Sequence, residues 1–185
     1  MGTALILVEL QQDYLPGGRF PLVGADEAVG RAAHLLEAAR RASIPVVHVR
    51  HLSTRPDAAF FLPGTRGALF ATAVEPAPGE AIIEKHLPNS FLETGLDAVL
   101  EDAGVDRLVV AGMMTHMCVD ATVRAAVDLG YDVVLTADAC ATRDLSWEGR
   151  TIPAPDVQAA FLAALDGRYG IVVSTGEAVA RLAGE

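Results

Sequence analysis

The chain has 185 residues, of which 51% are apolar and 21% are charged, a composition typical of a folded domain and unlike that of a disordered chain. Its 24 acidic and 14 basic side chains give a formal net charge of −10 at pH 7, which makes nucleic acids and anionic membrane surfaces poor candidate partners. We expect a single domain over residues 1–185 that binds a small molecule.

Neither export nor membrane insertion is indicated. Every apolar run is far shorter than the roughly 20 residues that a membrane-spanning helix needs, and the first ten residues lack the basic start of a signal peptide. The two cysteines, Cys118 and Cys140, are therefore expected to be free thiols in a cytoplasmic protein.

Short β-branched or Leu-rich runs alternate along the chain with Ala-rich stretches of helical period. The predicted strands are residues 4–8, 46–50, 81–84, 108–111, 132–136 and 171–174. The predicted helices between or after them are residues 25–42, 91–103, 115–129, 156–165 and 176–182. This alternation predicts a Rossmann-like α/β fold, a three-layer α/β/α sandwich with a six-stranded parallel sheet.

One connection, residues 51–79, is much longer than the others and rich in proline and glycine. Connections of this length usually shape a site or an interface. Ligands of a parallel sheet bind beyond the carboxyl ends of its strands. The residues that directly follow the predicted strands are therefore the first candidates for chemistry.

Three reactive side chains occupy such positions. Glu9 closes the first predicted strand and Lys85 closes the third, and Cys118 lies six residues beyond Gly112, which follows the fourth. Thr115 is a natural N-cap residue, which places Cys118 in the first turn of a helix, where free N–H groups and the helix dipole favour the thiolate. Cys118 could equally be a small buried residue, and Glu9 and Lys85 a plain salt bridge.

The surroundings of these residues resemble the isochorismatase-like cysteine hydrolases, a superfamily that includes nicotinamidases and N-carbamoylsarcosine amidohydrolase. The similar segments are VELQQDYLPGG at residues 8–18, EKHLPNSFLETGL at 84–96 and GMMTHMCVDATVRAAVDLGYDV at 112–133. The resemblance covers nearly the whole chain, with the elements in the family's order and spacing.

The resemblance implies a catalytic triad of Glu9, Lys85 and Cys118. It also implies a cis peptide bond between Met113 and Met114, with backbone N–H groups of this turn and of Cys118 holding the oxyanion of a tetrahedral intermediate. The implied activity is hydrolysis of a C–N bond in a small amide, carbamoyl or lactam substrate through a thioester, and these steps need no cofactor.

The chain departs from the family pattern at its acid. The family usually has D-x-Q-x-D-F, and here Glu9 and Tyr14 stand at the first and last of those positions. The extra methylene of glutamate moves the carboxylate by about 1.5 Å, and a misplacement of that order can cost about a hundredfold in rate. Two alternatives stay open: hydrolysis of a vinyl ether as in isochorismate, and a binding protein impaired in catalysis.

The remaining expectations rest on position. Nicotinamidases of this family hold a metal with an Asp-x-His motif that residues 48–52 do not match, so we predict no metal. Trp147 lies in a predicted loop and is a candidate contact with a second subunit, because we expect a homo-oligomer, a dimer or a tetramer. Candidate substrate-binding residues are Tyr14, Arg50, His51, Phe61 and His116.

Overall fold

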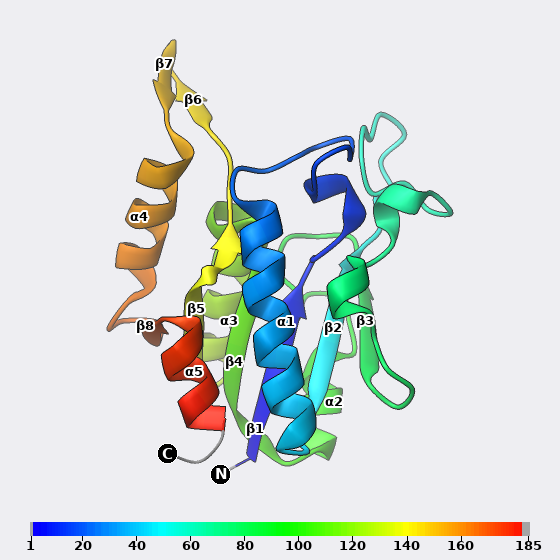
Figure 1. Cartoon of the computed structure of the whole chain (residues 1–185), viewed down its shortest axis with the longest axis vertical. Helices are drawn as coiled ribbons and strands as arrows, with labels where there is room; N and C mark the ends of the chain where they lie inside the picture. The colour runs from blue at the N-terminus through cyan, green and yellow to red at the C-terminus, as the bar shows by residue number, and fades with distance from the viewer. Residues whose placement is uncertain (1, 183–185) are drawn as a thin grey trace.

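A six-stranded parallel sheet forms the centre of the computed structural model, which describes residues 2–182. Every pairing between neighbouring strands is parallel. The strand order is β3-β2-β1-β4-β5-β8, so the first strand of the chain runs through the middle of the sheet (Figure 1). The strands are β1 Gly2–Val8, β2 Val46–His51, β3 Ala81–Lys85, β4 Val105–Met113, β5 Asp132–Ala141 and β8 Ile171–Val173.

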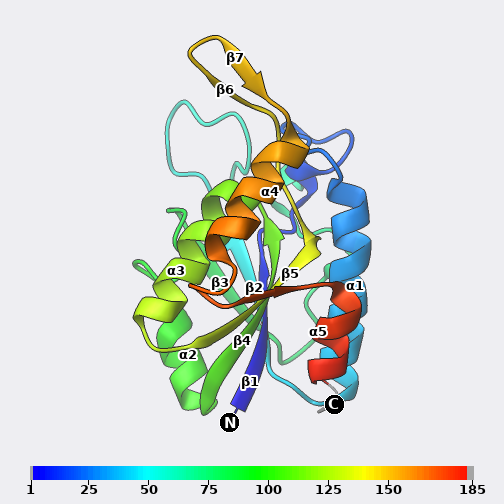
Figure 2. The ribbon, with the colours of Figure 1, turned by 90° about the vertical axis from the view of Figure 1, so that its left-hand side faces the viewer.

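Helices cover both faces of this sheet (Figure 2). One layer contains α1 (Ala25–Arg41) and α5 (Thr175–Leu182), and the other contains α2 (Leu96–Asp102), α3 (Asp120–Asp128) and α4 (Ala154–Leu165). The predicted three-layer α/β sandwich with its six-stranded parallel sheet is therefore confirmed. Among residues 2–182, no helix combines the length and the apolar character needed to cross a membrane.

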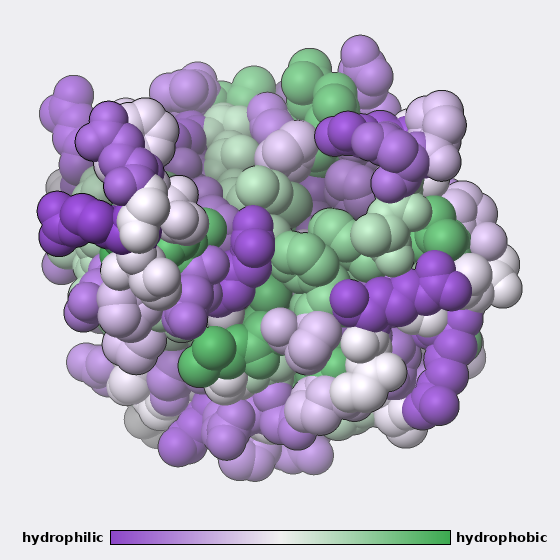
Figure 3. Space-filling view, turned by 90° about the horizontal axis from the view of Figure 1, so that it is seen from above, coloured by the Kyte–Doolittle hydropathy of each residue, from purple (hydrophilic) through white to green (hydrophobic). Residues whose placement is uncertain are grey.

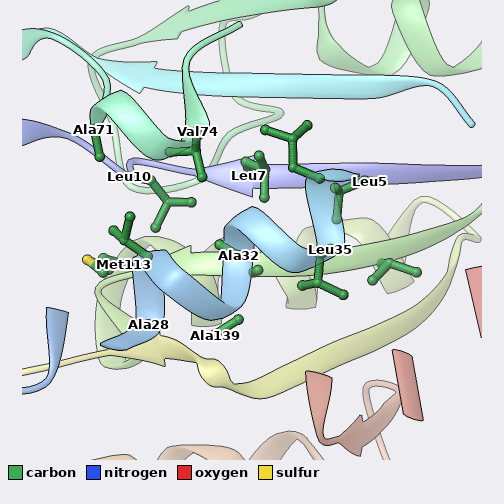
Figure 4. Close-up of a cluster of buried hydrophobic side chains, with 14 of the residues drawn as sticks. Leu5, Leu7, Leu10, Ala28, Ala32, Leu35, Ala71, Val74, Met113 and Ala139 are labelled. Carbon is green, nitrogen blue, oxygen red and sulfur yellow. The ribbon is translucent and has the colours of Figure 1, made fainter. Parts of the chain in front are cut away.

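The central strand β1 sends its side chains alternately into the two helical layers. Leu5 and Leu7 pack beneath α1 in the cluster of Figure 4, whereas Ala4 and Ile6 belong to the cluster on the other face. Because both faces are covered, the strand reads as an unbroken apolar run. Glu9, the residue that follows β1, brings the first charged group to the carboxyl end of the sheet.

The helix α2 begins later than the sequence predicts, at Leu96 in place of residue 91. The cause is Thr94, whose hydroxyl donates to the carbonyl of Ser90 at 2.6 Å and accepts from the N–H of Leu96 at 3.2 Å. These two bonds hold the preceding segment in a turn, because a threonine side chain can replace helical backbone partners.

The long connection between β2 and β3 folds back over the end of β1. The backbone N–H of Ala71 donates to Leu10 O at 2.8 Å. Near its other end, the Glu80 carboxylate accepts from Arg40 Nε at 2.7 Å and lies 2.8 Å from His48 Nε2. Burial lowers the pKa of His48. The connection is thus fastened to Leu10, just after β1, and to α1 and β2, and its middle part forms a wall beyond the carboxyl end of the sheet.

The structure contains a hairpin that is not predicted from the sequence. Strands β6 (Leu145–Trp147) and β7 (Arg150–Ile152) pair in antiparallel fashion and project from the body of the molecule (Figures 1 and 2). Glu148 and Gly149 join them with φ values of 50° and 77°, as a type I′ turn requires. Trp147 therefore lies in a strand, where it is 69% exposed, and its contact with a second subunit stays a prediction.

Candidate active site

Glu9 follows β1 at a point where the backbone turns sharply. Its φ is +51°, a left-handed conformation that is costly for a residue with a side chain. Its N–H still donates to Val49 O at 2.9 Å, so the pairing with β2 continues up to the turn. The residue is only 1% exposed, and a carboxylate buried to this degree needs partners.

Lys85, the last residue of β3, supplies the main partner. Its ammonium contacts Glu9 Oε1 and donates to the carbonyls of Leu87 and Pro88 at 2.7 and 3.1 Å. It is also only 1% exposed. Because β2 lies between β3 and β1, the two side chains meet across the end of the intervening strand.

Cys118 reaches the same region from the segment that follows β4. Gly112 allows β4 to approach β1 closely: its φ is 142°, and a side-chain carbon there would lie 2.0 Å from a carbonyl oxygen of β1. The peptide bond between Met113 and Met114 is cis. The chain then enters a π-helical turn, Thr115–Val119, which continues directly into α3.

The start of this helix differs from the expected one. Thr115 does not act as its N-cap, because its hydroxyl donates to Ala141 O in β5 at 3.2 Å. Thr115 is completely buried, so its hydroxyl needs a protein partner, and the neighbouring strand provides one. The prediction of a Thr115 N-cap is therefore wrong.

The thiol of Cys118 responds to both members of the ion pair. Burial, followed by the negative charge of Glu9, raises the pKa of Cys118 well above its usual value, while the charge of Lys85 acts in the opposite direction. The buried surroundings of Cys118 thus favour the thiol, whereas the helix position predicts the thiolate. A nucleophilic Cys118 needs a base at the moment of attack, and Glu9 is the acidic side chain that acts on it.

A pair of buried hydroxyl groups joins the lysine segment to the cysteine helix. Ser90 Oγ lies 2.8 Å from Thr122 Oγ1, which also accepts from the N–H of Ser90 at 3.1 Å. Thr122 lies on α3 one turn beyond Cys118, and Ser90 lies in the turn after Lys85. This bond fixes the two segments relative to each other.

Two predicted substrate-binding residues, Tyr14 and Phe61, form a buried wall beside Glu9. The Tyr14 hydroxyl donates to Glu9 Oε2 at 3.4 Å, and the two aromatic rings meet edge to face at 4.6 Å. Burial, then the charges of Glu9 and Cys118, raises the pKa of Tyr14. The phenol therefore keeps its proton and acts as a donor.

His51 lies beside the Glu9–Lys85 ion pair. Its Nδ1 lies 3.4 Å from Lys85 Nζ and 3.8 Å from Glu9 Oε1, and burial lowers its pKa. The amide of Gln11 fixes its backbone, accepting from the His51 N–H at 2.8 Å and donating to the His51 carbonyl at 3.0 Å. Gln11 belongs to the motif that carries the resemblance, but its role is not predictable from the sequence because its partner His51 lies 40 residues further along the chain.

Arg50 and His116, also predicted to bind substrate, have side-chain partners other than Glu9, Lys85 and Cys118. The Arg50 guanidinium pairs with Glu84 of β3. His116 Nδ1 lies 2.5 Å from Thr142 Oγ1, and the imidazole ring packs against Phe161 of α4 with centroids 5.9 Å apart. A role of these two residues in substrate binding stays a prediction.

Arg143, which lies two residues beyond β5, is not predicted from the sequence. Its guanidinium lies 4.9 Å from the ring centroid of Phe20. After burial, its charge is the next cause that lowers the pKa of His116, and it also opposes the rise in the pKa of Tyr14. Arg143 therefore lies near the aromatic wall to which Tyr14 belongs. Seen from above, this end of the molecule has apolar side chains near its centre and hydrophilic ones around them (Figure 3).

Among residues 2–182, no three His, Cys, Asp or Glu side chains are arranged so that they could hold a metal ion. The two histidines of β2 point to opposite faces, His48 toward Glu80 and His51 toward Lys85.

Comparisons with known proteins agree on one family. The model of the isochorismatase domain matches residues 3–177. The uncharacterized isochorismatase family protein YddQ of Bacillus subtilis is 45% identical over 175 residues, which cover 95% of this chain and 97% of that protein. The chain belongs to the isochorismatase family. An isochorismatase-family crystal structure from Oleispira antarctica has a TM-score of 0.93 at 48% identity and covers 97% of this chain and 96% of its own.

Membership of the isochorismatase family makes the chain a hydrolase. Maleamate amidohydrolase of Pseudomonas putida is 28% identical over 193 aligned positions, which cover 97% of this chain and 86% of that enzyme. Relatives of this type identify the chain as an enzyme of the amidohydrolase kind.

Proposed function

We propose that this enzyme hydrolyses a C–N bond in a small amide, carbamoyl or lactam substrate, with Cys118 as the nucleophile. The observation that carries this proposal is the meeting of one acid, one ammonium and one thiol beyond the carboxyl ends of separate strands. Glu9 contacts Lys85, and the charges of both act on Cys118. Such a set of groups supports acyl transfer, because it holds a nucleophile, a base and a group that orients the base.

The first half of the reaction forms a thioester. The Glu9 carboxylate accepts the proton of the Cys118 thiol as the sulfur attacks the carbonyl carbon of the substrate. Backbone N–H groups near Met114 and Cys118 stabilise the oxyanion of the tetrahedral intermediate. When that intermediate collapses, the C–N bond breaks and the amine leaves with the proton that Glu9 carries.

The second half regenerates the enzyme. A water molecule gives a proton to Glu9 and attacks the thioester carbon, and the carboxylic acid leaves as the Cys118 sulfur takes that proton back. Throughout the cycle, the Lys85 ammonium stays beside Glu9 and offsets the negative charge that the buried site carries.

A panel of substrates tests this proposal. Purified wild-type and Cys118→Ala proteins are incubated with amides, carbamoyl compounds and lactams, and the appearance of ammonia or of a free amino group is measured. We expect wild-type protein to release amine from at least one class and the variant from none. Full activity of the variant would refute the cysteine mechanism. Release of pyruvate from isochorismate, with no activity on the amides, would instead support ether hydrolysis.

A further inference from the structure

We propose that Tyr14 is a positioning residue that orients the Glu9 carboxylate for proton transfer from Cys118. This inference rests on the proposed function, in which Glu9 is the base. Glutamate has one more rotatable bond than aspartate, so its carboxylate loses more conformational freedom when it is held in one orientation. A glutamate at this place therefore needs more than one contact to keep its oxygens fixed.

The two oxygens of Glu9 have different partners. Lys85 Nζ contacts Oε1, and the Tyr14 hydroxyl donates to Oε2 at 3.4 Å. An ion pair on one oxygen and a hydrogen bond on the other fix the plane of the carboxylate, which a single contact would leave free to rotate. The phenol bond is long for an O–H···O bond, and hydrogen bonds of an active site often shorten when the substrate binds.

Tyr14 is itself held rigidly. Its ring packs against those of Phe61, Phe60 and Phe20, with centroids 4.6, 5.9 and 6.3 Å away. Its backbone carbonyl accepts from the N–H of Leu22 at 3.0 Å. Only 1% of the residue is exposed. The direction of the hydroxyl is therefore set before any substrate arrives, and it points at the carboxylate.

A double-mutant cycle tests this role. Tyr14→Phe, Glu9→Asp and the double variant are compared with wild type by the rate at which iodoacetamide alkylates Cys118 at pH 7. Trypsin places the two cysteines on different peptides, 108–124 and 125–143, so mass spectrometry separates the two reactions. We expect Tyr14→Phe to slow alkylation of Cys118 by about five- to tenfold, the effect of one lost hydrogen bond.

The coupling between the two positions is the decisive result. In Glu9→Asp the carboxylate is drawn back by about 1.5 Å, away from the hydroxyl, so the double variant should react at the rate of Glu9→Asp alone. Equal losses from Tyr14→Phe in both backgrounds would overturn the proposal. Alkylation of the Tyr14→Phe variant at the wild-type rate would do the same.

Tyr131→Phe is the matched control. Its hydroxyl also donates to a carboxylate, Asp97 Oδ1, at 2.7 Å, but at the opposite end of the sheet. This variant should lose thermal stability without any change in the alkylation rate. A merely structural Tyr14 would behave in the same way, which would count against the proposal. Because alkylation needs no turnover, a coupled cycle supports the role of Tyr14 even where wild-type protein hydrolyses no amide, an outcome that would sink the proposed function alone.

Discussion

Asp13 and Gly67 lie so close together that a side-chain carbon on Gly67 would sit 2.0 Å from Asp13 Oδ1. The buried Asp13 carboxylate accepts from the N–H of Phe61 at 2.7 Å and from the N–H of Arg19 at 3.1 Å. One acid thus joins the segment after β1 to the long connection that supplies Phe61. Gly67 leaves the space for that acid, and the aromatic wall beside Glu9 depends on both residues.

We predict that Gly67→Ala destabilises the protein by about 2 kcal/mol, because the methyl group must displace a buried, hydrogen-bonded carboxylate. Urea denaturation measures this loss. Gly30→Ala is the control, since Gly30 lies in α1 with no neighbouring atom within 4 Å of an added side-chain carbon. It should stabilise the protein by about 0.5–1 kcal/mol. Equal stability of the two variants would contradict this account of Gly67.

Glu80 should contribute stability that depends on pH. The hydrogen bond from Arg40 is the main cause that lowers the pKa of Glu80 to about 2, from a usual value of 4.5. A group with a lowered pKa stabilises the fold above its unfolded pKa, and this contribution is lost as the pH falls from about 5 toward 2.

We therefore expect Glu80→Gln to lower the unfolding free energy by about 1 kcal/mol at pH 7, a modest value because water screens part of the interaction. The difference from wild type should vanish near pH 2. Denaturation curves at several pH values measure it. Glu75→Gln, an exposed residue of the same connection, should change little at any pH. A Glu80→Gln loss that persists unchanged at pH 2 would show that charge is not its cause.

The pKa of Cys118 should shift in opposite directions when the two charges are removed in turn. The charge of Glu9 raises this pKa and that of Lys85 lowers it. In Glu9→Gln the midpoint of the pH profile for Cys118 alkylation should move down, although the rate at pH 7 falls because no base takes the thiol proton. In Lys85→Met the midpoint should move up. Circular dichroism confirms that each variant is folded, since breaking a buried ion pair is strongly destabilising. Shifts in the same direction would mean that the pair does not act on the thiol through charge.

Replacing Glu9 with the shorter aspartate should impair the enzyme, because the Glu9 carboxylate reaches both Lys85 and Tyr14 only with its full side chain. We predict that Glu9→Asp lowers kcat by about a hundredfold. Glu84→Asp makes the same change on an exposed residue of β3 and should leave kcat unaltered. A gain in activity in Glu9→Asp would instead favour the alternative of a chain impaired by its glutamate.

The centre of the sheet is predictable from sequence because β1, β4 and β5 are largely buried. Residues 4–8, 108–111 and 133–135 of these strands are all apolar, and glycine or proline follows most of the helices between them. The same pattern predicts which residues lie at the ends of the strands. The meeting of Glu9 and Lys85 is therefore accessible to sequence reasoning, although the contact itself depends on the strand order.

Other features depend on contacts that local patterns do not encode. The hairpin turns at Glu148 and Gly149 without the Asn-Gly or Asp-Gly pair that marks such turns. Threonine is a residue type that often caps helices. The buried hydroxyl of Thr115 instead donates to Ala141 O, because β5 lies beside it. The bond between Tyr14 and Glu9 needs a turn with positive φ that a glutamate seldom adopts.

Trapping of the covalent intermediate tests the central claim most directly. The enzyme is mixed with a substrate found in the panel, quenched with acid during turnover, digested with trypsin and analysed by mass spectrometry. Cys140→Ala serves as the control, because burial raises the pKa of Cys140 to about 12 and its loss should leave turnover intact. We predict an acyl group on peptide 108–124, linked through Cys118 and absent in Cys118→Ala. Turnover by Cys118→Ala at the wild-type rate, or an acyl group on any other residue, would contradict the account.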